Sequence, residues 1–257
     1  SNLGATFTVD AAGGTDSVTV NGTSVADTIN VVKGATTTVQ VNALQTISLP
    51  AAGNENVSVE AGDGGDTINV SGTASSGQLL AINGGSPTSN SLTAADTLNV
   101  TLATAGTTTV SPGATPDAGT LLNPDGAINF AGLEFVTLAA AAAGANTVTF
   151  SGTHDNDTLA LQFLNGANRV WINDRAVVSF SNYQTVNLNG LSLYHVAYSG
   201  ATDNGTWEKV QGFTGSIGAG KTMRVHSGSG PVSALSAADL EGALRETRRP
   251  RPDHAVR

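Results

Sequence analysis

The densest combination of glycines and acids in the sequence is the loop Gly62-Asp63-Gly64-Gly65-Asp66. Calcium takes six to eight oxygen ligands, which two carboxylates and inward glycine carbonyls could help to supply. The loop therefore predicts a calcium site at Gly62, Asp63, Gly64 and Asp66. A tight corner is the alternative, because glycine permits positive φ and an Asp before a strand caps its own turn. Both interpretations stay open, although five other copies of the phrase, an Asp or Asn followed by Thr or Ser, lack this glycine pattern.

A second polar cluster, GTHDNDTL, spans residues 152–159. Asp155 and Asp157 lie two residues apart, so on an extended segment they share one face, and they form a second candidate metal site. Paired carboxylates can also hydrolyse glycosides, but such a pair must flank the scissile bond, which two acids on one strand do not. Arg169 is the only Arg or Lys near these acids in the sequence. A polar turn is therefore the main expectation here, and an active site the alternative.

The remaining chemistry-bearing side chains are isolated. His195 is expected on a strand, His226 on a β-rich edge, and the two tryptophans in core or corner packing, with a sugar platform as the alternative. The sequence has no Ser-His-Asp order, no H-E-x-x-H motif and no phosphate-binding loop. We therefore expect a protein that is not an enzyme, with a polysaccharide lyase or hydrolase as the alternative.

Composition narrows the class of protein further. The chain has 257 residues, 31 of them glycine, and a net charge of −9. Nucleic acid is excluded as an expected partner because phosphate binding needs a basic face. The chain contains no cysteine, which rules out disulfides and thiol chemistry. No stretch is long enough to span a membrane, and no signal peptide is evident.

One phrase recurs along the chain: an Asp or Asn, then Thr or Ser, then an alternating apolar strand. It begins at Asp16, Asp27, Asp66, Asp96, Asn146 and Asp157. Other short alternating runs lie between these phrases, separated by Gly, Asn, Asp and Ser. Because like residues return at like offsets, the pattern favours stacked coils over a sandwich. We predict an all-β fold, a parallel β-helix or β-solenoid of short coils.

The pattern also predicts a domain organisation. The solenoid is expected over residues 1–198, with a loop insertion at about 103–126 where Gly, Pro, Thr and Ala dominate. A C-terminal β module is expected at 199–232, where aromatic and basic residues become denser. Residues 233–257 are expected to form a short helix at 236–247 and a basic tail, because Pro250 and Pro252 cannot continue the helix. Five of the arginines lie in the last 13 residues.

Residues 61–69, AGDGGDTIN, match the calcium-repeat nonapeptide at every fixed position but the first, where Ala61 replaces glycine. The chain thus resembles the hemolysin-type (RTX-like) calcium-binding repeat proteins, and more widely the large repetitive surface proteins of environmental bacteria. The resemblance implies a parallel β-solenoid over roughly 10–190, with calcium between successive nonapeptides. No second glycine-rich copy adjoins 61–69, so one half of such a site is missing. The stretch 212–230 resembles one edge of a lamin-tail-like β domain.

These observations lead to one expectation for function. We expect a secreted or cell-surface structural protein, a filament-forming or adhesive β-solenoid subunit that assembles with copies of itself through β edges, with calcium as its candidate cofactor. A solenoid leaves an open row of N–H and C=O groups at each end unless a cap covers it. Surface polysaccharide is the other expected partner, and a polysaccharide-binding or polysaccharide-cleaving β-helix protein is the alternative. An ice- or ligand-binding solenoid would need an unbroken Thr ladder on a flat face.

Overall fold

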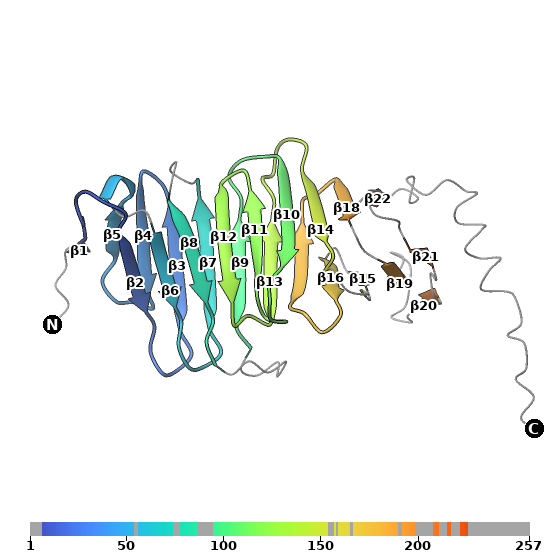
Figure 1. Ribbon diagram of the computed structural model, residues 1–257, viewed down its shortest axis with the longest axis horizontal. Coiled ribbons are helices and arrows are strands. Elements are labelled where there is room, and N and C mark those ends of the chain that lie inside the picture. Colours follow the sequence, from blue (N-terminus) through green and yellow to red (C-terminus); the bar gives the residue numbers. More distant parts are fainter. Residues whose placement is uncertain are drawn as a thin grey trace, which may run out of the picture.

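The computed structural model of the chain consists almost entirely of β-strands (Figure 1). It describes residues 7–53, 56–73, 78–86, 95–153, 157, 159–164 and 167–189, and the strands at 192–198, 208–210, 215–216 and 222–225. In this part of the chain the helical content is a single 3-10 turn, η1 (Ala51–Gly53). The strands agree with the alternating apolar runs of the sequence.

Two sheets contain the strands. Sheet A has 13 strands and sheet B has nine. Sheet A contains β1 (Phe7–Thr8), β3 (Thr28–Lys33), β4 (Thr36–Val41), β5 (Ile47–Pro50), β7 (Thr67–Gly72), β9 (Thr97–Thr101), β13 (Phe135–Ala139), β15 (Leu159–Leu164), β16 (Ala167–Ile172), β17 (Val177–Ser181), β19 (Ser192–Tyr198), β20 (Glu208–Val210) and β21 (Gly215–Ser216). Sheet B contains β2 (Ser17–Asn21), β6 (Asn56–Glu60), β8 (Leu79–Asn83), β10 (Thr107–Pro112), β11 (Gly119–Asn123), β12 (Gly126–Ala131), β14 (Thr147–Ser151), β18 (Thr185–Asn189) and β22 (Thr222–Val225).

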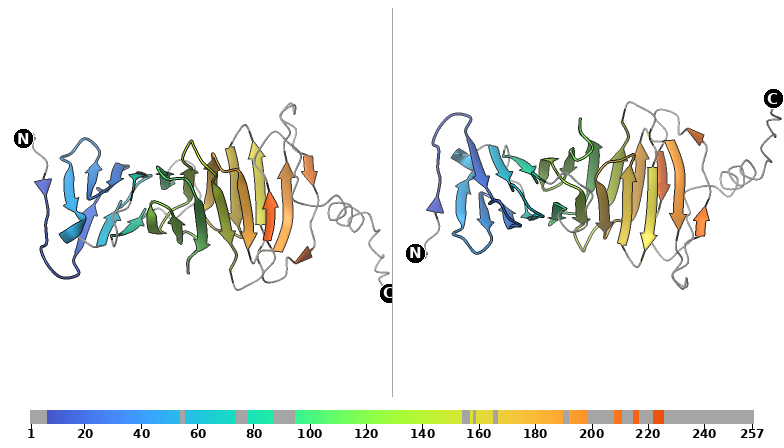
Figure 2. Two further views of the ribbon diagram at one scale, coloured as in Figure 1. Left: turned by 90° about the horizontal axis from the view of Figure 1, so that it is seen from above. Right: turned by 90° about the horizontal axis from the view of Figure 1, so that it is seen from below.

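In its regular coils the chain alternates between the two sheets, and the strands of successive coils pair in parallel. In sheet A, β3 pairs with β7, β7 with β9 and β9 with β13. In sheet B, β2 pairs with β6 and β6 with β8. The two views in Figure 2 show the strands following one another along the long axis of the molecule. The fold is a parallel β-solenoid, which confirms the predicted fold class.

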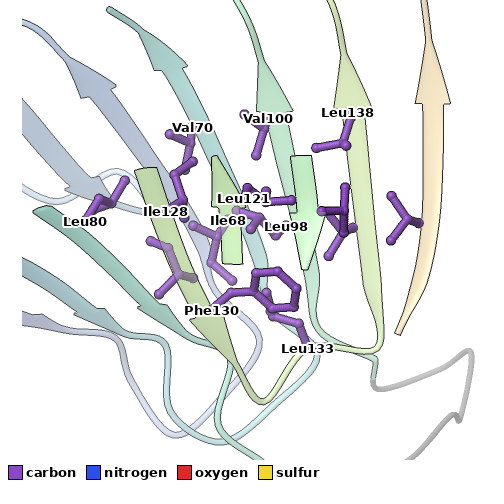
Figure 3. Packing of buried hydrophobic residues seen from close by; sticks show 14 of the residues in the cluster. Ile68, Val70, Leu80, Leu98, Val100, Leu121, Ile128, Phe130, Leu133 and Leu138 are labelled. Carbon is purple, nitrogen blue, oxygen red and sulfur yellow. The ribbon is translucent and has the colours of Figure 1, made fainter. Parts of the chain in front are cut away.

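The core lies between the two sheets because every second residue of a strand points inward. On β3, for example, Ile29 and Val31 are buried, whereas Thr28 is exposed. Side chains from both sheets meet in Figure 3, with Ile68 and Leu98 from sheet A and Leu80 and Ile128 from sheet B. The core is aliphatic over most of its length, as expected for a chain with 5% aromatic residues.

Three antiparallel meanders of three strands each interrupt the parallel coils: β3–β4–β5, β10–β11–β12 and β15–β16–β17. In each meander the last strand pairs in parallel with an earlier strand, namely β1, β8 or β13. The first strand pairs in parallel with a later strand, namely β7, β14 or β19. The three meanders are therefore topologically equivalent insertions, two in sheet A and one in sheet B.

The second meander corrects one prediction. The loop insertion expected at about 103–126 is wrong, because this stretch contains β10 and β11, which are ordinary members of sheet B. Their inward residues Val110 and Leu121 are buried in the core. The composition misled because glycine and proline lie at the strand ends: Pro112 is the last residue of β10 and Gly119 the first of β11.

At the C-terminal end, short strands return onto both sheets. β20 and β21 pair antiparallel with β19, and β22 pairs antiparallel with β18. The strands found within the predicted C-terminal β module of 199–232 thus extend the solenoid sheets. The predicted helix at 236–247 and the basic tail lie outside the described residues.

Candidate functional site

Four acidic residues, Asp27, Asp66, Asp96 and Glu134, form a buried row that we call the carboxylate ladder. Each directly precedes a strand of sheet A that pairs in parallel with its neighbour, and each is at most 4% exposed. Asp66 Oδ1 accepts the Asp27 N–H, Asp96 Oδ1 accepts the Asp66 N–H, and Glu134 Oε2 accepts the Asp96 N–H, each at 2.7 Å. The carboxylates of Asp66, Asp96 and Glu134 therefore each cap a backbone N–H of the neighbouring coil.

The second oxygen of each later carboxylate in the ladder has no hydrogen-bond partner among the described residues. These oxygens are Asp66 Oδ2, Asp96 Oδ2 and Glu134 Oε1. Burial raises the pKa of all three groups, and that of Asp96 reaches about 6. The backbone hydrogen bond opposes this shift, and the neighbouring acids add to it. These three carboxyl groups thus resist ionisation because burial removes them from solvent.

Sequence reasoning identified three of the ladder residues and missed the fourth. The recurring Asp-Thr phrase begins at Asp27, Asp66 and Asp96. Glu134 is a different residue type, followed by Phe135 in place of Thr, and it comes directly after a meander. The alternation that follows it, FVTL, was the available signal, since it places β13 in register with β9.

The predicted calcium loop forms a tight corner. Gly62 and Gly64 have φ of +106° and +131°, and a Cβ at either would approach backbone of the preceding coil, at Thr23 and Ala26. Packing alone therefore explains both glycines. The Gly62 carbonyl accepts the Ser86 N–H, and Gly64 donates its N–H to the Ser86 carbonyl.

The two carboxylates of this loop lie in different surroundings. Asp63 is exposed, whereas Asp66 is fully buried in the ladder. Within the described residues, no group of three or more His, Cys, Asp or Glu side chains could hold a metal ion. Calcium at Gly62, Asp63, Gly64 and Asp66 therefore stays a prediction, with Asp63 as its one exposed carboxylate.

Asp157, from the second predicted metal site, caps a turn. Its carboxylate accepts the Thr153 N–H at 2.8 Å, the Thr153 hydroxyl at 2.7 Å and the Asn173 side-chain N–H at 2.9 Å. His154 and Asp155 lie outside the described residues. Asp157 is buried and fixed by these bonds, which suits a structural cap and agrees with the expected polar turn.

The same cap occurs at the first meander. Asp27 accepts the Thr23 N–H, the Thr23 hydroxyl and the Asn42 side-chain N–H. Asn42 and Asn173 both have positive φ, at 51° and 56°. These equivalent bonds show that β3–β4–β5 and β15–β16–β17 are two copies of one repeat.

A small cavity lies between β10–β12 and β16–β17. Its volume is about 30 Å³, and its lining is mainly apolar, with Phe130, Phe150 and Trp171 among the residues. Arg175 is the ionisable side chain of the lining, and its Nη1 donates to the carbonyls of Gly113 and Thr115. A volume of this size holds about two waters, which excludes a sugar ring. Trp171 is thus a half-buried packing residue here; the side chains of His195, Trp207 and His226 lie outside the described ones.

The N-terminal end of sheet B leaves one edge open. The edge strand β2 pairs with β6, and no other described strand lies beside it. At the same end Phe7 of β1 is 58% exposed, and Val9, Val18 and Ile47, which pack against the core, are only partly buried. The end of the core is therefore incompletely covered by the described residues.

Comparisons of the chain with protein-family models, with curated proteins and with solved structures found no match. The resemblance to calcium-binding repeat proteins accordingly stays a prediction. No helix in the described part of the chain is long and apolar enough to cross a membrane. What the geometry defines is a β-solenoid with internally repeated coils, meanders and polar corner caps.

Proposed function

We propose that the protein is a structural subunit of the cell exterior, a β-solenoid that assembles with copies of itself through its sheet edges. The open edge of β2 is the observation that carries this proposal. An unpaired strand offers a row of backbone donors and acceptors, which natural proteins normally protect with Lys, Pro, a bulge or a covering segment. β2 has the sequence SVTVN and contains neither a charge nor a proline.

The other features of the fold support a structural role. The ladder and the corner caps use their carboxylates to hold backbone groups, which leaves these acids unsuited to acid–base work on a substrate. The 30 Å³ cavity is too small for a substrate of ordinary size. The location outside the cell is proposed from the acidic, cysteine-free, Thr- and Asn-rich composition, and labelling of intact source cells by an antibody against the chain would test it.

Assembly is tested by the mass of the purified full chain as a function of concentration. Sedimentation velocity should show species heavier than the monomer as the protein is concentrated from micromolar to near-millimolar, and electron microscopy should show whether they are filaments. The measurement is made with calcium and with a chelator. A chain that stays monomeric throughout both series would overturn the proposal.

Polysaccharide binding is the second candidate, and the outer face of β10, β14 and β18 favours it. The outward residues align across the strands as uncharged rows of hydroxyl and amide groups. Within one row, residues on neighbouring strands lie about 4.8 Å apart, so the face presents a regular array of hydrogen-bonding groups. The residues are Thr107, Thr109, Ser111, Thr147, Thr149, Ser151, Thr185, Asn187 and Asn189.

Co-sedimentation with insoluble cellulose or chitin tests this second function. Thr149→Glu, in the middle of the face, should release the protein from the pellet, whereas Thr137→Glu on sheet A should not. Equal retention of both variants would count against this face as the binding surface.

A further inference from the structure

The edge strand β2 occupies the same place in the fold as the internal strand β14. Each is the sheet B strand that leads into a sheet A meander, and each pairs in parallel with a later sheet B strand, β6 or β18. On its other side β14 pairs with β10. The described part of the chain places no strand at the corresponding side of β2. The side of β2 that faces away from β6 therefore corresponds to the side of β14 that β10 covers.

Burial shows the effect of the missing neighbour. Val148 and Phe150, the inward residues of β14, are both 0% exposed. On β2 the first inward residue, Val18, is only half-buried, and the outward residue Thr19 is exposed where its counterpart Thr149 is half-buried. A strand added beside β2 would restore the burial that β14 has.

The backbone of β2 directs specific groups to the open side. Asp16 O accepts the Asn56 N–H, and the Gly22 N–H donates to Glu60 O. The backbone N–H and C=O groups of the even-numbered residues of β2 therefore point toward β6. Because backbone groups alternate along a strand, the N–H and C=O of Ser17, Thr19 and Asn21 face away from β6. These groups have no partner strand among the described residues.

We propose that β2 pairs antiparallel with β2 of a second copy, about a twofold axis at Thr19. This inference rests on the proposed assembly through β edges and names the edge, the partner and the register. Thr19 then faces Thr19 of the second copy, and Ser17 faces Asn21, so the outward-facing groups form about six backbone hydrogen bonds, two at each of three pairs.

This register also fits the side chains. Val18 of one copy lies opposite Val20 of the other, on the core side of the joined sheet, and the polar residues remain on the outer side. The pairing joins the two incompletely covered core ends, where Phe7 is exposed. An isologous contact of this kind is the common form of a homodimer. Head-to-tail pairing of β2 with β22 of the next copy is the alternative arrangement, and it would leave Thr19 away from its own counterpart.

A single cysteine tests the register, because the chain has none of its own. Across an antiparallel hydrogen-bonded pair the Cα atoms lie about 5.5 Å apart, within the range that a disulfide or a short thiol cross-linker bridges. Thr19→Cys should cross-link into a covalent dimer of twice the chain mass under mild oxidation. Thr149→Cys is the matched control, at the equivalent position of a strand that is paired on both sides, and it should stay monomeric on a denaturing gel.

A mixing experiment checks the register independently. Ser17→Cys and Asn21→Cys should each fail to cross-link alone, because each then lies about 13 Å from its own copy, four residues along the strand. Mixed together, the two variants should form the covalent heterodimer. In addition, Thr19→Lys places two like charges opposite each other and should shift the dimer to monomer, whereas Thr149→Lys should not.

The outcomes separate this inference from the proposed function. If the chain assembles but Thr19→Cys gives no more dimer than Thr149→Cys, the twofold pairing is wrong and assembly through another edge stands. If the chain stays monomeric at every concentration, both are wrong. If the mass doubles, Thr19→Cys cross-links and the mixed pair forms its heterodimer, the pairing is established.

Discussion

The carboxyl group of Asp96 makes the stability of this solenoid depend on pH in a direction opposite to that of most acidic side chains. It is fully buried, one oxygen accepts the Asp66 N–H, and the other oxygen has no described partner. Burial, assisted by Asp66 and Glu134, raises the pKa of Asp96 to about 6, against the backbone hydrogen bond that lowers it.

The sign follows from linkage. An Asp whose pKa is raised on folding makes the folded chain bind a proton that the unfolded chain gives up. Its contribution is complete below the usual value of 3.8 and is lost as the pH rises through about 6. The difference between 3.8 and about 6 corresponds to at most about 3 kcal/mol, and screening near the corner reduces our expectation to about 1 to 2 kcal/mol. Asp66 and Glu134, also shifted upward, act in the same direction.

Asp96→Asn isolates this contribution. The amide oxygen can still accept the Asp66 N–H, and no charge has to be buried at neutral pH. At pH 7.5 the variant should be more stable than the natural chain by about 1 to 2 kcal/mol, and near pH 4.5 the two should be nearly equal. Asp10→Asn is the control, since Asp10 is exposed and caps the Ala12 N–H locally. This control should leave the pH dependence unchanged.

Urea denaturation followed by circular dichroism, at intervals from pH 4.5 to pH 7.5, measures the free energy of unfolding. The natural chain should lose stability as the pH rises from 4.5 to about 6, and the loss should level off above that value. The reasoning is refuted if its stability increases with pH, or if Asp96→Asn shows the same pH dependence as the natural chain.

Three further outcomes follow from the geometry. Asn173→Ala should lower the free energy of unfolding by about 1 to 2 kcal/mol, because it removes a hydrogen bond to buried Asp157 and places Ala at φ 56°; Asn173→Gly should cost less, and equal costs would contradict the role of φ. Phe150→Ala should lower the free energy of unfolding by about 3 to 5 kcal/mol in the same assay, since the ring is fully buried and lies 5.6 Å from the Phe180 ring between centroids. A decrease below about 1 kcal/mol would mean that the core collapses around the gap. Gly62→Ala should lower the melting temperature equally with calcium and with chelator, because the added Cβ would clash with Thr23 O. A calcium-dependent rise in the melting temperature of the natural chain, abolished by Asp63→Asn, would instead establish the calcium site.

Several parts of this fold could be read from the sequence because they depend on local patterns. Alternation predicts a strand wherever two inward residues, such as Ile68 and Val70, must share one face. The recurring Asp-Thr phrase marks coils that stack in register, and Thr28, Thr67 and Thr97 are indeed direct neighbours across sheet A. The phrase could not show which oxygens the acids would bond, since Asp66 caps a residue 39 positions earlier.

The meanders depend on pairing over long distances. Nothing local to 107–131 indicates that β12 turns back to pair with β8 while β10 pairs with β14. The capping acid of the middle meander also lies at a different position from those of the other two meanders. It is Asp125, in the turn between β11 and β12, and it accepts the N–H groups of Ala103 and Thr104. An acid placed on either side of a turn can satisfy the same backbone groups, so its position in the chain does not predict its role.

By itself the sequence determined an all-β solenoid without cysteine, with acids at its corners, because strand alternation and turn residues act between near neighbours. Tertiary structure alone decided that Asp66 is buried while Asp63 is exposed, that Glu134 completes the ladder, and that β2 has only one partner strand among the described residues. The physical reason is that burial, pKa and edge exposure are properties of a residue's neighbours in the adjacent coils, and those neighbours lie tens of residues away along the chain.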